Sequence, residues 1–470
     1  MSTPVNNRQA IGWLLLVMLA AAGLRFYGLT VQSYWFDELF SAYYSDPAHS
    51  FQTVLELTFA DVHPPLYQVL MWLSYNVFGY TEWAGRLVSA IAGTLAIPVI
   101  WLLGRELFNS RVGLYAAALA VVNYYLLYYS QEARSYALFY LLCSLSLLFF
   151  IRSLRYSEAR HCVGFIISSL ALAYTHYFGF ILFVAEACIL LSWLQIYGWS
   201  DRALIKRAVI SAAVVLVGIL PLLNIIIGHS GIENFWIYQP GPAFLVNYFI
   251  LYFYSSLLAA AMFILILAGC SQLVVQRSWT AERFMVLALV IWIFLGYFLP
   301  WLRGELGQPV LTDRNTIMLL PAMLIIGAYG LSLLPMVYQR VLILVLVGYS
   351  LYFLIGPLGY YTKVKKNQYR EITQALDQYS TVFPVYTLEY NETKYNVYFR
   401  QMGTDIRAVD FMELEALLEA GEAPAVFWLA DGFGRLMQTD IDERFGLIEI
   451  DRLEFRGTRA VLYKNPAVSE

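Results

Sequence analysis

Residues 10–39 read AIGWLLLVMLAAAGLRFYGLTVQSYWFDEL, an apolar run that ends in the acidic pair Asp37-Glu38. The apolar part, 10–28, is long enough to cross the roughly 30 Å hydrocarbon core of a bilayer. Carboxylates are costly beside hydrocarbon, so a pair kept at the end of a span is a candidate site for chemistry. The stretch therefore predicts a first membrane span followed by a functional loop.

The composition extends this pattern along most of the chain. Of the 470 residues, 60% are hydrophobic and 13% are charged, and the mean hydropathy is +0.60. Further apolar runs of about spanning length bring the predicted total to eleven: 84–103, 112–129, 135–151, 162–176, 177–198, 208–228, 256–276, 284–301, 314–335 and 340–360. The expected fold class is an all-α polytopic membrane domain with about 11 transmembrane helices plus juxtamembrane helices.

Charged residues concentrate after residue 360. Residues 361–470 hold 13 basic and 18 acidic residues, against 17 and 15 in the first 360. We therefore predict a membrane domain over 1–360 and a small soluble α/β domain over 361–470, entered through a solvated linker that contains Lys363, Lys365 and Lys366. The strands expected in this domain are Pro384–Tyr390, Ile406–Val409, Ala425–Ala430, Leu447–Phe455 and Ala460–Tyr463.

The distribution of basic residues predicts the orientation of the chain in the membrane. The run Pro64–Gly79 is apolar but only 16 residues long. If this run lies in the interface and does not cross, 12 basic residues of the first 360 face the cytoplasm and 5 face outward, as the positive-inside rule requires. The N-terminus is then cytoplasmic, and residues 361–470 lie on the outer face.

The same topology places several polar clusters on the outer face, where we expect them to share one cavity. They are Asp37-Glu38, Asp61 with His63, Glu132 with Arg134, His176, and Asp313-Arg314. Each has a structural alternative to a catalytic role. Acids cap helix starts, prolines after a histidine begin a helix, an exposed Glu-Arg pair contributes little, and an interfacial histidine can simply be hydrogen-bonded.

The chemistry of these side chains favours phosphate and hydroxyl substrates. A carboxylate such as Asp37 can accept the proton of an incoming hydroxyl, with Glu38 orienting that acceptor. The planar fork of Arg134 suits a phosphate because it bonds two oxygens at once. His63 can donate to a phosphate or bind a metal through a ring nitrogen.

In this order the motifs resemble the polyprenol-dependent glycosyltransferases of the GT-C superfamily. The resemblance is to the bacterial branch related to protein O-mannosyltransferases and to the lipid A aminoarabinose transferase. It covers about the first 330 residues and is carried by these segments: Trp35-Phe36-Asp37-Glu38, Asp61-Val62-His63-Pro64-Pro65-Leu66-Tyr67, Arg86, Ser130-Gln131-Glu132-Ala133-Arg134-Ser135-Tyr136-Ala137-Leu138, Thr175-His176-Tyr177, and Arg314 with Pro321.

The resemblance implies an inverting transfer of one sugar from a polyprenyl-phosphate carrier to a hydroxyl of a lipid, glycan or protein. The reaction would occur on the outer face of a bacterial inner membrane, among membrane lipids and without nucleic acid. It implies these roles: Asp37, Glu38 and Glu132 catalytic; His63, Arg134 and Arg314 at the donor phosphate; Asp61, Tyr67 and His176 at the substrate. A divalent cation, Mg or Mn, would be held by Asp37 and Glu132 if the reaction uses one.

Three other functions compete with this interpretation. A secondary transporter also uses intramembrane acids and histidines, but it predicts two related halves with charges near the midplane, and the sequence contains no visible duplication. A membrane subunit without activity is the second alternative. Within the enzymes, an oligosaccharide polymerase or ligase would also face outward but would use a different acceptor.

Overall fold

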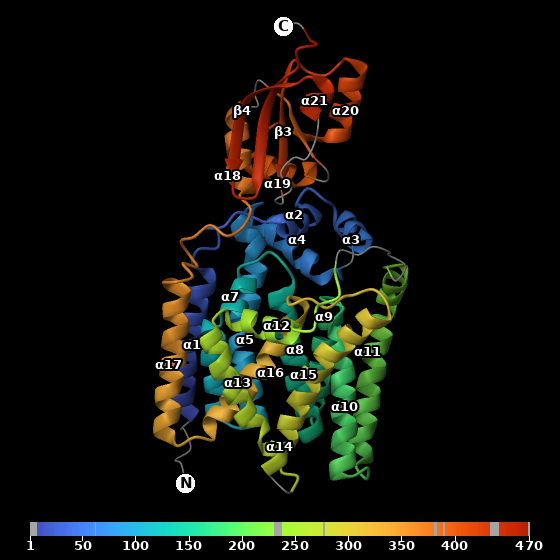
Figure 1. Cartoon of the computed structure of the whole chain (residues 1–470). Helices are drawn as coiled ribbons and strands as arrows, with labels where there is room; N and C mark the ends of the chain where they lie inside the picture. The colour runs from blue at the N-terminus through green and yellow to red at the C-terminus, as the bar shows by residue number, and fades with distance from the viewer. Residues whose placement is uncertain are drawn as a thin grey trace. The chain divides into compact units, whose positions relative to one another are not determined.

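Most of the chain is helical, as Figure 1 shows. A computed structural model describes residues 7–468 except 62, 230–236, 276–277, 380–382, 389–390 and 433–440. The helices before residue 360 are α1 (Asn7–Phe26), α2 (Phe36–Tyr44), α3 (Phe51–Ala60), α4 (Leu66–Phe78), α5 (Glu82–Leu107), α6 (Ser110–Val122), α7 (Tyr124–Ser130), α8 (Tyr136–Arg155), α9 (Ala159–Ala173), α10 (Gly179–Tyr197), α11 (Arg202–His229), α12 (Phe244–Phe253), α13 (Ser256–Cys270), α14 (Gln272–Val275), α15 (Ala281–Leu306), the 3₁₀ helix η1 (Asn315–Leu319), α16 (Leu320–Ser332) and α17 (Met336–Ile355).

Within the described residues, eight helical stretches are long and apolar enough to cross a membrane. They are α5, α8, α10, the first part of α11, α13 with α14, α15, η1 with α16, and α17. A ninth is obtained if the bent pair α6 and α7 counts as one span. The chain is thus a multi-pass membrane protein, and the predicted runs 10–28 and 162–176 correspond to the shorter apolar helices α1 and α9.

The predicted span 112–129 is broken at Asn123, where α6 and α7 meet at an angle of 63°. The Asn123 side chain accepts a hydrogen bond from the Leu126 amide and donates one to the Tyr252 carbonyl, each 3.0 Å long. Arg25, at the end of α1 and 0% exposed, donates to the Ala120 and Val121 carbonyls. These side chains satisfy backbone groups that a break inside an apolar region would otherwise leave unpaired.

Contacts between Cα atoms divide the chain into two compact units. The helical unit comprises residues 1–27, 55–67 and 88–360. Its core lies between α5, α6, α8, α15 and α16, and α16 is the most enclosed of its spans. The second unit comprises residues 28–54, 68–87 and 361–470. Two segments from the N-terminal part of the chain therefore fold together with the C-terminal segment, while the predicted domain division at residue 360 stays a prediction.

The C-terminal segment builds a five-stranded mixed sheet in the order β2-β1-β3-β5-β4. Strand β1 is parallel to β2 and β3, whereas β5 is antiparallel to β3 and β4. Each predicted strand region overlaps one of these strands, although residues 389–390 of the first region lie outside the described residues. The elements are α18 (Tyr369–Tyr379), β1 (Val385–Thr387), α19 (Glu392–Met402), β2 (Ala408–Asp410), α20 (Phe411–Ala420), β3 (Val426–Gly432), α21 (Ile441–Phe445), β4 (Ile448–Phe455) and β5 (Thr458–Lys464).

Helices cover both faces of this sheet. Alternate residues of a strand point to opposite faces, so neighbouring residues of β3 contact different helices. Phe427 and Leu429 of β3 pack with Leu414 of α20. Trp428, between them, faces Tyr379 of α18 with ring centroids 5.9 Å apart. The α/β architecture expected for this segment is confirmed.

Candidate active site

The predicted site residues divide between the two units. Asp37 and Glu38 belong to the unit that contains the C-terminal segment. The other predicted residues belong to the helical unit: Asp61, His63, Tyr67, Glu132, Arg134, His176 and Arg314. Each set is described by itself, and their meeting in one cavity stays a prediction.

Asp61, His63 and Arg134 form one hydrogen-bonded row in the helical unit. Nδ1 of His63 lies 2.9 Å from Oδ2 of Asp61, and Nε2 of His63 lies 2.9 Å from Nη2 of Arg134. A guanidinium carries only donors, so Nε2 accepts and the ring proton lies on Nδ1, facing the carboxylate. The imidazole is thus held as a neutral link that orients the Arg134 guanidinium, which is itself buried.

Tyr67 supports the same arginine from the backbone side. Its hydroxyl lies 2.9 Å from the Ser89 hydroxyl, which donates to the Arg134 carbonyl at 3.0 Å. Tyr67 is 1% exposed. This burial favours a role in holding the Arg134 turn over the substrate contact that we predicted for Tyr67.

His176 lies in the loop between α9 and α10, and it is buried against the flat face of Phe139 at 4.4 Å. Its Nδ1 accepts the Phe178 amide, and its ring also bonds the Asn315 side chain. Burial, together with the nearby His63 and Arg134, lowers the pKa of His176 to about 3. The ring is therefore neutral at physiological pH, and both of its nitrogens are hydrogen-bonded within the protein.

A second set of charged residues lies near Tyr129 of α7. Glu132, Asp313 and Arg314 all act electrostatically on this hydroxyl. Glu132 is 0% exposed, and Arg314 precedes η1 in a partly buried position. Asp313 accepts a 2.7 Å hydrogen bond from Tyr125. Glu132, Asp313 and Arg314 thus all lie within electrostatic range of one tyrosine of the helical unit, while the site roles expected of Glu132 and Arg314 stay predictions.

Glu38, in the other unit, is a fully buried ion-pair residue. Arg86 bonds both of its carboxylate oxygens, at 2.8 and 2.9 Å, and Lys366 Nζ lies 2.8 Å from Oε2. Burial alone would raise the pKa of Glu38, but the charges and hydrogen bonds of Arg86 and Lys366 outweigh it and hold the pKa below its ordinary value. The Trp35 amide also donates to Oε2, so Glu38 caps the start of α2.

These contacts change the interpretation of two predicted residues. Glu38 is 0% exposed, which favours a structural role over the predicted one of orienting an acceptor. Asp37, its neighbour on α2, is only partly buried, and its role as the reacting carboxylate stays a prediction. The prediction that Lys366 lies in a solvated linker is wrong, because its side chain is 7% exposed and pairs with Glu38.

Comparison with known proteins relates the chain to one sequence family and to several solved structures. Residues 62–226 match the family described as dolichyl-phosphate-mannose-protein mannosyltransferase, whereas no curated protein matches the chain significantly. The structure of ArnT from Cupriavidus metallidurans bound to undecaprenyl phosphate is 14% identical, covers 98% of this chain and 99% of that chain, and has a TM-score of 0.67. The apo structure of the same protein also gives a TM-score of 0.67, with 14% identity over 97% of this chain and 98% of that chain.

A more distant solved structure shares the architecture. The archaeal oligosaccharyltransferase AglB from Archaeoglobus fulgidus, in complex with an inhibitory peptide and a dolichol-phosphate, is 13% identical over 92% of this chain and 70% of that chain, with a TM-score of 0.56. The chain has the GT-C glycosyltransferase fold. The predicted resemblance to ArnT and to protein O-mannosyltransferases is confirmed in the fold and, over residues 62–226, by the family match.

The predicted cation ligands of this GT-C protein stay a prediction. Across the described residues, the structure contains no group of three or more His, Cys, Asp or Glu side chains placed to hold a metal ion. Asp37 and Glu132, the pair expected to hold Mg or Mn, belong to different units. Their suitability as joint ligands is therefore untested by the geometry.

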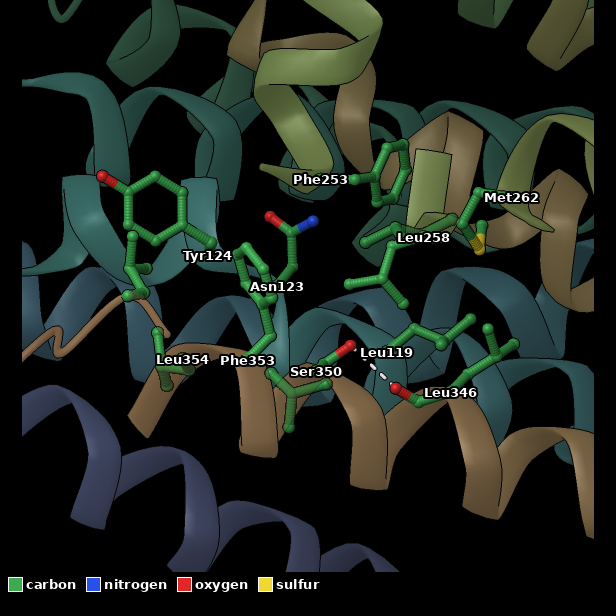
Figure 2. A pocket seen from close by; sticks show the side chains of 13 residues that line it. Leu119, Asn123, Tyr124, Phe253, Leu258, Met262, Leu346, Ser350, Phe353 and Leu354 are labelled. Carbon is green, nitrogen blue, oxygen red and sulfur yellow. Dashed lines mark hydrogen bonds between the residues drawn. The ribbon is translucent and has the colours of Figure 1, made fainter. Parts of the chain in front are cut away.

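An apolar hollow lies beside the helix break of the GT-C domain (Figure 2). It is small, with a volume of about 20 Å³, and is lined by α6, α7, α12, α13, α16 and α17. Its polar lining comes from Asn123, Tyr124 and Ser350, and the Ser350 hydroxyl donates to the Leu346 carbonyl at 2.7 Å. None of the predicted site residues is among those that line it.

Several residues of the GT-C site had no clear signal in the sequence. Ser89, Asn315 and Lys366 each contact a predicted residue, yet each stands in a segment without a recognisable motif. Arg86 is the exception, because an arginine at the start of a span is costly unless it is paired. The cost of an unpaired arginine at this position could have been used to predict a buried acidic partner for Arg86.

Proposed function

We propose that this protein is a membrane glycosyltransferase that moves one sugar from a polyprenyl-phosphate carrier to a hydroxyl of a lipid, glycan or protein. The observation that carries the proposal is the row Asp61–His63–Arg134, which orients a buried guanidinium. The fold supports it, since the similar ArnT structure is bound to undecaprenyl phosphate and the AglB complex contains a dolichol-phosphate.

The donor half of the reaction depends on Arg134. When the bond between the anomeric carbon and the phosphate oxygen breaks, the electron pair leaves with the polyprenyl phosphate and negative charge grows on its oxygens. A preorganised guanidinium stabilises that charge more strongly in a buried site than in water. His63 and Asp61 hold the fork in place, and Arg314 adds a second positive charge.

The acceptor half depends on Asp37. The acceptor oxygen forms its bond to the anomeric carbon on the face opposite the phosphate, so the configuration inverts. The hydroxyl proton passes to the Asp37 carboxylate, which acts as general base. Glu132 is the second acid of the site. A divalent cation held by Asp37 and Glu132 would screen the phosphate charge.

We assign the protein to the inner membrane of a bacterium, with its N-terminus in the cytoplasm and residues 361–470 on the outer face. The basic asymmetry of the loops supports this orientation. Two of the five basic residues expected outside, Arg25 and Arg86, are 0% and 1% exposed and hydrogen-bonded within their units. The cost of placing these two charges near the membrane is therefore offset by hydrogen bonds within the protein. Leaving them out of the count makes the excess of basic residues on the cytoplasmic face larger.

One feature of the structure bears on the transport alternative. Transporters bind their substrates at broken helices near the midplane, and α6 and α7 form such a break. Here the freed backbone groups are bonded by Asn123 and Arg25, and the adjoining hollow is lined mostly by apolar side chains. The break therefore supports a packed structural element more than an ion site. A polymerase or ligase would share the donor site and differ in its acceptor.

The donor site is tested with undecaprenyl phosphate as the probe and purified protein in nanodiscs. Arg134→Lys keeps the charge but loses the fork. Losing a charge-assisted hydrogen bond of about 1.5–3 kcal/mol should weaken binding by about tenfold to a hundredfold. His63→Leu should have a similar effect, whereas His63→Gln retains an acceptor for Arg134 and should bind more tightly than His63→Leu.

Arg303→Lys is the matched control, because Arg303 is an exposed arginine of α15 and should leave affinity unchanged. Parental affinity in both Arg134→Lys and His63→Leu would show that the row is only structural. Mass spectrometry of envelope glycans and lipids from cells with and without the gene would then identify the sugar and the acceptor.

A further inference from the structure

Helix α2, which carries Asp37, is held on two opposite faces by residues of the C-terminal segment. With 3.6 residues per turn, successive side chains are rotated by about 100° around a helix. Phe36 and Phe40 therefore share one face of α2, and Glu38 lies roughly opposite. Asp37 lies on the flank between these faces. All contacts described below are within the unit formed by residues 28–54, 68–87 and 361–470.

The Glu38 face is held by the start of the C-terminal segment. Lys366 Nζ lies 2.8 Å from Oε2 of Glu38, with both side chains buried. The backbone nearby is joined as well, because the Ser33 hydroxyl donates to the Asn367 carbonyl at 2.6 Å. Gln32 bonds the carbonyl of Lys363 and the amides of Lys365 and Lys366. The loop before α2 thus lies along residues 363–367.

The aromatic face is held by α19, which packs against α2 (Figure 1). The ammonium of Lys394 lies 4.0 Å from the Phe36 ring centroid and 4.9 Å from that of Phe40. Lys394 is 0% exposed. A cation over an aromatic face is worth more when it is desolvated, so this contact links the two helices more strongly than an exposed lysine would.

Both ends of α2 are also tied to α19. The Tyr34 amide, just before the helix, donates to the Tyr398 hydroxyl at 2.5 Å, and that hydroxyl donates to Glu82 Oε1 at 2.5 Å. Beyond the helix, Arg400 donates to Oδ1 of Asp46 at 2.8 Å. Asp46 is 1% exposed. Lys394, Tyr398 and Arg400 follow one another on α19, so a single helix fixes the start, one face and the end of α2.

We infer that the segment 361–470 is a clamp that sets the position of the Asp37 carboxylate, with Lys366 and Lys394 as positioning residues. The inference rests on the proposed function, in which Asp37 is the base. A reacting group displaced by about 1 Å can cost about a hundredfold in rate. A domain without a ligand-binding motif of its own thereby contributes to catalysis through the helix that it holds.

The test compares Lys394→Met, which keeps an apolar stem of similar length, with Lys394→Arg, which keeps the cation. Two quantities are measured on the full-length protein: hydrogen exchange of the α2 amides, and the kinetics of sugar transfer. Lys394→Met should raise exchange across 36–44 and lower kcat by about tenfold to a hundredfold, with the KM for the donor unchanged. Lys394→Arg should restore both.

Arg444→Met is the matched control. Arg444 lies in the same segment and pairs with Glu415 and Glu419 on the surface. Losing this exposed cation should change neither quantity. If Lys394→Met unfolds the protein, Lys366→Met removes the other contact and should give the same pattern.

The two readouts separate failure of the clamp from failure of the proposed function. Exchange of α2 requires no activity, so unchanged exchange in both Lys394→Met and Lys366→Met overturns the clamp whatever the reaction is. Raised exchange with an undiminished kcat also overturns it, because α2 would then move without consequence. An Asp37→Asn protein that transfers sugar at the parental rate would refute the base, and with it the catalytic part of the inference.

Discussion

Replacing Arg86 by methionine tests the buried ion pair on which α2 depends. The Arg86 guanidinium has five N–H donors, and the structure uses all of them. Two bond Glu38, and the others bond the carbonyls of Leu29, Gln32 and Ser33 at 2.6, 2.7 and 3.2 Å. Methionine fills similar space but removes every one of these donors.

The expected loss of unfolding free energy in Arg86→Met depends on the burial of the pair and on the partner that Glu38 keeps. Breaking a buried ion pair by removing one partner costs about 3–5 kcal/mol, because the other charge is left uncompensated. Lys366 still pairs with Glu38 in the variant, so we expect the lower end, about 3 kcal/mol. For a unit of roughly 150 residues this corresponds to a fall of about 6–12 °C in Tm.

The assay is thermal unfolding of the purified protein in one detergent, with Arg444→Met as the exposed counterpart. That variant should lose about 0–1 kcal/mol. Equal, small shifts in Tm for Arg86→Met and Arg444→Met would refute the reasoning, because burial would then have no energetic consequence at this pair.

The pH dependence gives a second check of the same pair. The pKa of Glu38 is lowered in the folded protein from an ordinary value of 4.5, since Arg86 and Lys366 outweigh the effect of burial. A lowered folded pKa contributes stability that is present above the unfolded value and is lost as the pH falls toward the folded value. The Tm difference between the parent and Arg86→Met should therefore shrink below about pH 4.5.

The remaining predictions concern the base and the helix break. Asp37→Asn barely changes volume, so the protein should fold and bind undecaprenyl phosphate while sugar transfer falls by about a hundredfold or more; parental transfer rates would move the base to Asp61 or Glu132. Arg25→Met should cost about 1–3 kcal/mol of stability by leaving the carbonyls at the end of α6 without their donor; thermal unfolding measures this, and an unchanged Tm would mean that water replaces the guanidinium.

Helices and strands were largely predictable because each is decided by a local pattern. Apolar runs of spanning length gave the transmembrane helices, and short β-rich runs gave all five strands. The break at Asn123 was missed. A single polar residue inside the apolar run 112–129 does not indicate that its side chain caps a new helix. Helix α12 (Phe244–Phe253) was also missed, because ten residues are too few for a span.

The site was predictable in its residue types but not in its partners. The carboxylates and cations near the membrane were visible in the sequence because such groups are costly there. Which of two adjacent acids is buried was not visible, since Asp37 and Glu38 differ only by about 100° of rotation on one helix. Which acid faces the cations can be decided only when the positions of Arg86 and Lys366 are known. Lys366 lies more than 300 residues from Glu38 along the chain.

The unit that contains α2 is assembled from segments far apart in the sequence. It therefore cannot finish folding until the C-terminal segment has been synthesised. Glu38 and Arg86 leave the ribosome early, and they can find one another while the rest of the chain is still being made. Lys366 and Lys394 follow only after the stretch 88–360 has been translated. At about 5–20 residues per second the delay is roughly 15–55 s. For that interval the helix bearing Asp37 lacks its contacts with Lys366 and Lys394, so in a chain interrupted before residue 361 that helix keeps the Arg86–Glu38 pair but is not held by the C-terminal segment.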